Sequence, residues 1–218
     1  MLSAQSKFYK IRQNINGDNA KQLLGFLDSC LFKNYHRDSA LFYKGLVNLR
    51  LNQNIEAIKY HHLLQEEFPE FWEANYLEGL ICYVQKRYFE SVKCLTIVLK
   101  KNKYDWRAYY DRALAFAQTE AFEAALDDLD ACLRLNPTFA AAYYAKANNL
   151  EVLAQYDEAI MNYKKCLNLE AKNFDAYMGL AYAYQKNKQA GKACETINDA
   201  IKIGLDAAKE KRSIFCER

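Results

Sequence analysis

The stretch AAAYYAKANNLEVLAQYDEAIMNYKKCLNLEAKN, residues 140–173, decides the fold of this chain. Its apolar residues recur at helical spacing across residues 143–150 and, after a short break at Ala154 and Gln155, again across residues 159–167. The stretch therefore predicts a helix, a tight turn and a second, antiparallel helix.

The same pattern returns every 34 residues along the chain. Pro69 and Pro137 lie 68 residues apart, which is twice this period. Small residues at one place per helix allow two helix backbones to approach closely. Sliding the sequence by 34 aligns three such columns: Ala40, Ala74, Ala108, Ala142 and Ala176; Gly45, Gly79, Ala113, Ala147 and Ala181; and Ala57, Ser91, Ala125, Ala159 and Ala193.

Larger residues fill the columns between the small ones, as a packed core requires. One core column contains a histidine among apolar residues: His61, Leu95, Leu129, Tyr163 and Ile197. The period predicts five gapless units, at residues 38–71, 72–105, 106–139, 140–173 and 174–207.

Both ends of the array are predicted to be caps, because the terminal faces of a solenoid need shielding. Residues 1–37 form a degenerate amino-terminal repeat, in which residues 4–15 are a degenerate first helix and residues 18–35 match a second helix. Residues 208–218 are predicted to be a carboxy-terminal capping helix.

These columns resemble the tetratricopeptide repeat (TPR) family. The residues that carry the resemblance are the small pair, an aromatic near the start of the first helix and a proline at the turn between units: Tyr109, Tyr143, Tyr177, Pro69 and Pro137. The resemblance implies an all-α fold, a right-handed α-solenoid of antiparallel helix pairs. In one column, charged residues replace the family's usual Leu, and we expect their stems to lie along apolar surface with their heads in water: Lys44, Glu78, Arg112 and Lys146.

Composition agrees with a folded all-α protein. Hydrophobic residues make up 51% of the 218 residues, and 7 Gly and 2 Pro are too few for a many-turned β protein. The absence of an apolar run of roughly 20 residues predicts no membrane span. The odd count of 7 Cys, with no CxxC pair, favours free thiols in a reducing, cytoplasmic setting.

The resemblance implies that first helices line a concave groove. One groove column is a ladder of rings that ends at Met178, and such rings suit peptide binding. The alternative is that these rings pack between adjacent first helices, and that Arg107 and Asp111 form only a surface ion pair. The predicted peptide-binding residues are Phe42, Tyr43, Tyr76, Tyr110, Arg107, Asp111, Tyr144, Asn148, Glu151 and Tyr182.

The family's best-known ligand mode is a clamp of Lys, Asn and Arg side chains for a carboxy-terminal carboxylate. The ladder column stands where the first clamp lysine belongs, and only Asn148 matches the clamp by residue type. We therefore expect no binding of a chaperone tail through this clamp.

Catalytic and metal-binding patterns are not found. The histidines His36, His61 and His62 have no Cys or carboxylate at metal-ligand spacing, and structural, hydrogen-bonded roles are expected for them. Cys132 and Cys166 fall in a core column and are expected to be inert fillers.

The acidic residues Asp127, Asp128 and Asp130 diverge around a helix and are expected to form a solvated face. Without a phosphate-binding loop or nucleophile motif, we expect neither an enzyme nor a cofactor.

Three functions are compared on this basis. The leading hypothesis is a non-catalytic adaptor or scaffold that binds a protein or peptide partner. A second is a self-associating protomer, a homodimer formed through terminal helices that carry Ile214 and Phe215. Nucleic-acid binding through Lys7, Lys10 and Arg12 is disfavoured, because the net charge is only +3 and the groove columns hold one Arg and no Lys.

Overall fold

The computed structural model describes residues 17–216, and within them the chain forms twelve α-helices and no strand. The predicted helix at residues 4–15 and the basic residues Lys7, Lys10 and Arg12 lie outside the described part. Two compact bodies divide the chain, one ending at Lys103 and the other starting at Tyr104, and each is described separately. The all-α helical-repeat fold is as predicted.

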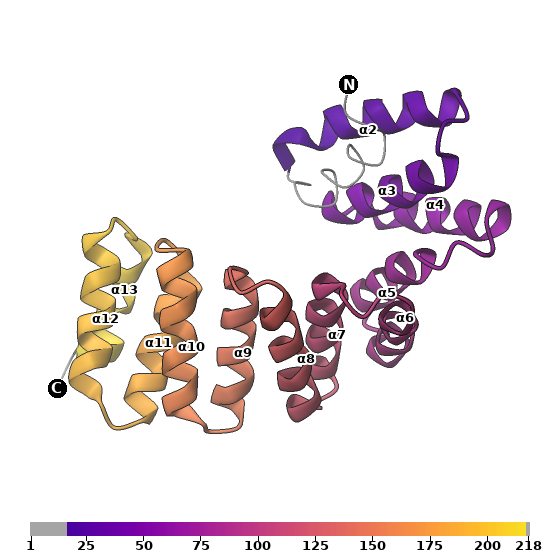
Figure 1. Ribbon diagram of the computed structural model, residues 1–218. Coiled ribbons are helices and arrows are strands. Elements are labelled where there is room, and N and C mark those ends of the chain that lie inside the picture. Colours follow the sequence, from indigo (N-terminus) through magenta and orange to yellow (C-terminus); the bar gives the residue numbers. More distant parts are fainter. Residues whose placement is uncertain (1–16, 217–218) are drawn as a thin grey trace. The chain divides into compact units, whose positions relative to one another are not determined.

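The amino-terminal body contains five helices, and each packs against the next in chain order (Figure 1). Its core includes the fully buried side chains of Leu27, Val47 and Leu64. The helices are α2 (Gly17–Phe32), α3 (Arg37–Arg50), α4 (Asn54–Glu67), α5 (Ala74–Val84) and α6 (Tyr88–Lys101).

The carboxy-terminal body continues the pattern with seven helices. Consecutive helices pack together, and α7 also contacts α9, α9 contacts α11 and α11 contacts α13, so first helices lie beside first helices. The helices are α7 (Trp106–Gln118), α8 (Phe122–Leu135), α9 (Ala140–Val152), α10 (Tyr156–Leu169), α11 (Phe174–Lys186), α12 (Ala190–Lys202) and α13 (Ala207–Cys216).

The turn inside each helix pair is the same five times. In each, one residue other than glycine adopts the left-handed conformation, with φ between 58° and 62°. In the α9–α10 turn, the Gln155 N–H donates to the Leu150 carbonyl (2.8 Å) and the Ala154 N–H to the Glu151 carbonyl (2.9 Å), which is a Schellman cap. The left-handed residues are Asn52, Lys86, Glu120, Ala154 and Lys188, spaced by 34.

The small-residue columns lie where helices approach closely. A Cβ atom added at Gly45 would stand 2.3 Å from Leu77 Cδ2, and one at Gly79 would stand 2.8 Å from Leu95 Cγ. The alanines at Ala108 and Ala142 are fully buried. The 34-residue columns thus mark helix contacts, while the number and bounds of the units stay a prediction.

The charged column does not hold its heads in water, as we had expected. Lys44 pairs with Asp28, Lys146 pairs with Asp130, and the Arg112 guanidinium donates two hydrogen bonds of 2.7 Å to Asp128. Each pair is separated by 16 residues, which places its members on adjacent helices.

Asp128 is therefore buried, and the solvated face expected for it is wrong. Burial raises the pKa of its carboxyl group, and the hydrogen bonds from Arg112 oppose that shift. The paired charge is what makes burial of this carboxylate tolerable.

The cysteines follow the prediction only in part. A disulfide joins Cys194 of α12 to Cys216 of α13, so free thiols were the wrong expectation for these two. Cys132 and Cys166 are fully buried, and burial raises their pKa to about 12 and about 11, as expected for inert thiols.

Helix α13 covers the end of the carboxy-terminal body by burying Ala208 and Phe215 against it. Among the described residues, no helix is both long and apolar enough to cross a membrane.

Candidate functional site

The predicted ring ladder is not uniformly exposed. In the amino-terminal body, the exposed fractions of Phe42 and Tyr76 are only 3% and 5%. The Phe42 ring packs edge-on against Phe71, with centroids 5.9 Å apart, and lies 6.4 Å from Tyr76. Tyr43 is half-buried against the cluster that contains Val47. In this body the rings pack between helices, as the alternative interpretation has it.

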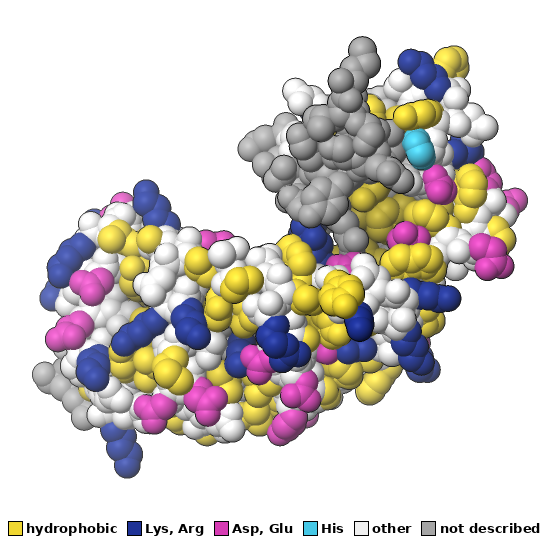
Figure 2. Space-filling view, in the orientation of Figure 1, with side chains coloured by type: hydrophobic (Ala, Val, Ile, Leu, Met, Phe, Trp, Pro, Cys, Tyr) yellow, Lys and Arg dark blue, Asp and Glu magenta, His cyan; other side chains and the backbone are white. Residues whose placement is uncertain are grey.

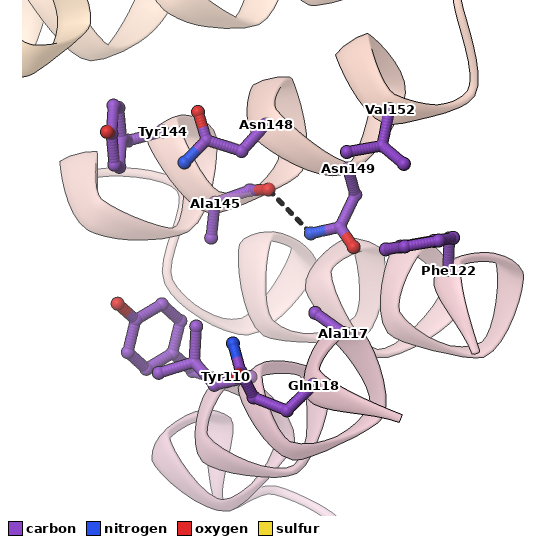
Figure 3. Close-up of a pocket in the computed structure, with 10 residues that line it drawn as sticks. Tyr110, Ala117, Gln118, Phe122, Tyr144, Ala145, Asn148, Asn149 and Val152 are labelled. Carbon is purple, nitrogen blue, oxygen red and sulfur yellow. Dashed lines mark hydrogen bonds between the residues drawn. The ribbon is translucent and has the colours of Figure 1, made fainter. Parts of the chain in front are cut away.

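A pocket opens in the carboxy-terminal body between the first helices α7 and α9, with a volume of about 310 Å³ (Figure 3). Three predicted site residues line it: Tyr110, Tyr144 and Asn148. Sequence analysis did not assign the remaining lining to a site; these residues are Leu114, Ala117, Gln118, Phe122, Ala145, Asn149 and Val152.

The two tyrosines form one end of the pocket (Figure 3). Tyr110 packs edge-on against Phe139, with centroids 4.8 Å apart, and Tyr144 lies 6.0 Å from the ring of Tyr163. Both tyrosines are only half-buried, so part of each ring faces the pocket. Because neighbouring rings hold them, they present apolar surface that is already ordered.

Asn149 gives the pocket a hydrogen-bond acceptor. Its Nδ2 donates to the Ala145 carbonyl (2.7 Å), which fixes the side chain, as Figure 3 shows. Its Oδ1 is buried and, among the described residues, has no hydrogen-bond partner. Since buried polar atoms are nearly always paired, this oxygen suits an N–H donor brought by a ligand.

Asn148 and Glu151 are held from below by Tyr163 of α10. The Tyr163 hydroxyl donates to Asn148 Oδ1 (2.6 Å) and lies 3.1 Å from Glu151 Oε2. Burial raises the pKa of Glu151, while the Tyr163 hydrogen bond lowers it. Burial likewise raises the pKa of Tyr163, so its hydroxyl stays protonated. Glu151 is thus part of this support and does not line the pocket.

Arg107, Asp111 and Tyr182 are also outside the pocket lining. The Arg107 guanidinium lies 4.0 Å from the centroid of the Trp106 ring. Tyr182 is exposed, with the Lys186 ammonium 5.1 Å from its ring centroid. The structure therefore brings together Tyr110, Tyr144 and Asn148 and leaves these three apart.

His61 departs from its predicted role. It is buried, as its core column predicts, with an exposed fraction of 6%. Its Nε2 has no hydrogen-bond partner among the described residues, so the expectation of a satisfied structural histidine is wrong. The reason is its neighbour on α5, Glu78, whose Oε2 stays 3.9 Å away.

The fold and the pocket together define an α-helical repeat protein. Two family profiles, both described as Tetratricopeptide repeat, match residues 87–140 and residues 140–173 and 174–203. The chain belongs to the tetratricopeptide repeat family.

Solved structures share this fold. The crystal structure of MamA superposes with a TM-score of 0.66 and 19% identity, covering 83% of this chain and 96% of MamA. YrrB, described as a TPR protein with an unusual peptide-binding site, superposes with a TM-score of 0.65 and 17% identity, covering 86% of this chain and 97% of YrrB. At these identities the likeness concerns the fold alone.

Curated relatives are longer proteins. Hsp70-Hsp90 organizing protein 2 of Arabidopsis thaliana is 28% identical over 145 residues, covering 66% of this chain and 25% of that protein. Serine/threonine-protein phosphatase T of Trypanosoma brucei brucei is 46% identical over 106 residues, covering 48% and 22%. The chain thus spans about a quarter of the length of these relatives.

Proposed function

We propose that this chain is a non-catalytic, cytoplasmic adaptor that holds a peptide segment of a partner protein in the pocket between α7 and α9. Tyr110 and Tyr144 are the apolar anchors, and the Asn149 oxygen accepts a hydrogen bond from the peptide. The observation that carries the proposal is this unpartnered buried acceptor beside two partly exposed rings.

The chemistry of the pocket favours a peptide. A peptide backbone presents N–H donors at regular intervals, and apolar side chains between them contact rings. A few such anchors are enough for micromolar binding, which corresponds to about −8 kcal/mol. Membership of the tetratricopeptide repeat family and the similarity to proteins named for organizing Hsp70 and Hsp90 support an adaptor role.

The clamp prediction remains part of this proposal: we expect the ligand to be an internal segment and not a carboxy-terminal tail. Carboxy-terminal chaperone peptides and the same peptides followed by a further residue should bind equally weakly. A strong preference for the free carboxylate would contradict this expectation.

The test begins with peptides selected from a random library on the intact chain, followed by Kd measurement by calorimetry. We expect Tyr144→Ala and Asn149→Ala each to weaken binding at least tenfold, because central anchors typically contribute more than about 1 kcal/mol. Met161→Ala, an exposed residue on the second helix α10, is the matched control and should leave Kd unchanged. Equal Kd values for all variants would place binding elsewhere.

Self-association through the terminal helix is weakened by the placement of its apolar residues. Phe215 is buried in the core of its own body, and Ile214, with an exposed fraction of 57%, is what remains on the surface. A molar mass that rises with concentration in light scattering, and falls back in Ile214→Lys, would favour the dimer.

The described surface also gives little support for nucleic-acid binding. On the face drawn in Figure 2, Lys and Arg are interspersed with Asp and Glu over the carboxy-terminal body. Nucleic-acid binding usually needs a continuous basic patch.

A further inference from the structure

Three potential metal ligands meet between α5 and α6 of the amino-terminal body. The ligand atoms of Glu78, Cys82 and Cys94 all lie within 4.8 Å of one another. Glu78 and Cys82 are one helical turn apart on α5 and so share a face. Gly79 between them lets α6 approach, since a Cβ there would lie 3.5 Å from the Cys94 Cβ.

His61 of α4 points a fourth donor at this group. Its Nε2 lies 3.9 Å from Glu78 Oε2. The ring is more than nine-tenths buried, and this nitrogen has no hydrogen-bond partner in the described part of the chain. Burial lowers the pKa of His61, which keeps the imidazole neutral, and the neutral ring is the form that binds metals.

The charge at Glu78 is the reverse of its column. The equivalent residues Lys44, Arg112 and Lys146 each supply a cation to an aspartate on an adjacent helix. At Glu78 the column supplies an anion instead, and the partner within ion-pair distance among the described residues is the neutral His61. The nearby Arg87 is occupied by Gln85 and Glu90.

We propose that His61, Glu78, Cys82 and Cys94 form a binding site for a thiophilic divalent cation, Zn²⁺. Two thiolates, one imidazole and one carboxylate make a four-coordinate set that zinc prefers. The ion would join α4 to the α5–α6 pair and replace the cation that the column lacks. Glu78, whose side chain is 36% exposed, leaves the site a path to solvent.

The geometry requires only side-chain movement. Donor atoms on a tetrahedral zinc lie about 3.3–3.8 Å apart, given metal–ligand distances of about 2.0–2.3 Å. The largest separation among Glu78, Cys82 and Cys94 therefore has to close by about 1 Å, which χ rotations provide.

Binding releases two protons. Burial raises the pKa of Cys82, and it raises the pKa of Cys94 to about 12, so both thiols are protonated without metal. The ion replaces both thiol protons, while Glu78 and His61 donate lone pairs, and no electron is transferred. Because protons compete with the metal, we expect the apparent affinity to rise with pH.

The test is a Co²⁺ titration of the full chain kept reduced with a phosphine. We expect one equivalent to give a thiolate-to-cobalt charge-transfer band with visible bands of tetrahedral geometry, and Zn²⁺ to displace it. Cys82→Ala/Cys94→Ala should abolish the band. Cys194→Ala/Cys216→Ala, which removes the two disulfide cysteines, should retain it.

Two further variants borrow residues from the chain's own columns, which favours correct folding. His61→Leu copies Leu95 and Leu129, and Glu78→Lys copies Lys44. We expect both to stay helical by circular dichroism and to bind at least tenfold more weakly in competition with a chromophoric chelator. A reduced wild-type chain without the band, a band that survives loss of Cys82 and Cys94, or unchanged affinity in both variants would overturn the proposal.

Discussion

The left-handed residue at Ala154 offers a direct test of the turn geometry. Its φ of 58° places a Cβ-bearing residue in a conformation that favours glycine. The side chain is exposed, so replacing it by hydrogen removes no packing contact. Ala154→Gly should therefore stabilise the chain.

The magnitude follows from two opposing terms. An L-residue in the left-handed region costs about 1–2 kcal/mol. Glycine loses about 0.4–1 kcal/mol through the greater freedom of the unfolded chain. The difference predicts a net gain of about 0.5–1 kcal/mol, or an increase in Tm of about 1–4 °C for a chain of this size.

Urea unfolding followed by circular dichroism measures this gain, with equal m-values as the check that the unfolding transition is comparable. Asn52→Gly is the matched control: it occupies the equivalent turn at φ 58°, but asparagine already tolerates this conformation, so we expect almost no change. A loss of about 1 kcal/mol in Ala154→Gly, as glycine causes in regular helix, would refute the left-handed turn.

Three other changes probe the carboxy-terminal body. Gly179→Ala puts a Cβ 2.4 Å from Tyr163 Cζ and should lower stability by about 1–3 kcal/mol in thermal melts. Because burial raises the pKa of Glu151 in the folded state, the native chain holds more protons just above the ordinary Glu value of about 4.3. Wild-type stability should thus fall relative to Glu151→Gln as pH rises through that window, measured by urea unfolding. Cys194→Ser/Cys216→Ser opens a link across 22 residues and should cost about 3 kcal/mol, concentrated in hydrogen exchange of α13.

Each of these has a control or a contradicting result. Gly191→Ala adds a methyl group where no atom lies within 4 Å, so it should not destabilise the chain as Gly179→Ala does. A wild-type and a Glu151→Gln chain with parallel pH profiles would mean that this carboxyl group titrates normally. Unchanged exchange in α13 after loss of the disulfide would show that Phe215 alone holds the helix.

The helix pairs could be predicted from sequence because their cause is local. Small residues repeated at 34 mark where backbones meet, and Gly79 or Ala142 needs no knowledge of distant residues to be recognised. The groove could be predicted only in part. Phe42 and Tyr110 share a column, yet Phe71 and Tyr76 pack around the first ring, whereas the second lines a pocket. A period identifies equivalent positions, but exposure depends on neighbours that differ between copies.

Contacts between helices explain the other differences. Asp128 was expected to be solvated because nothing within one helix pairs it, and its partner Arg112 is 16 residues away. His61 and Cys94 belong to different helices, so their meeting at Glu78 follows no short motif. Pairings set by packing at such separations are not visible in a single sequence.

The ion pairs of α8 bear on how such an array can change during evolution. Asp128 reaches back to Arg112 on α7, and Asp130 reaches forward to Lys146 on α9. Duplicating or deleting 34 residues would keep every turn intact, yet it would change which acid meets which base. The helix pairs are alike in backbone, while their charges give each one an address, and a copied segment would have to acquire a new address before it fitted.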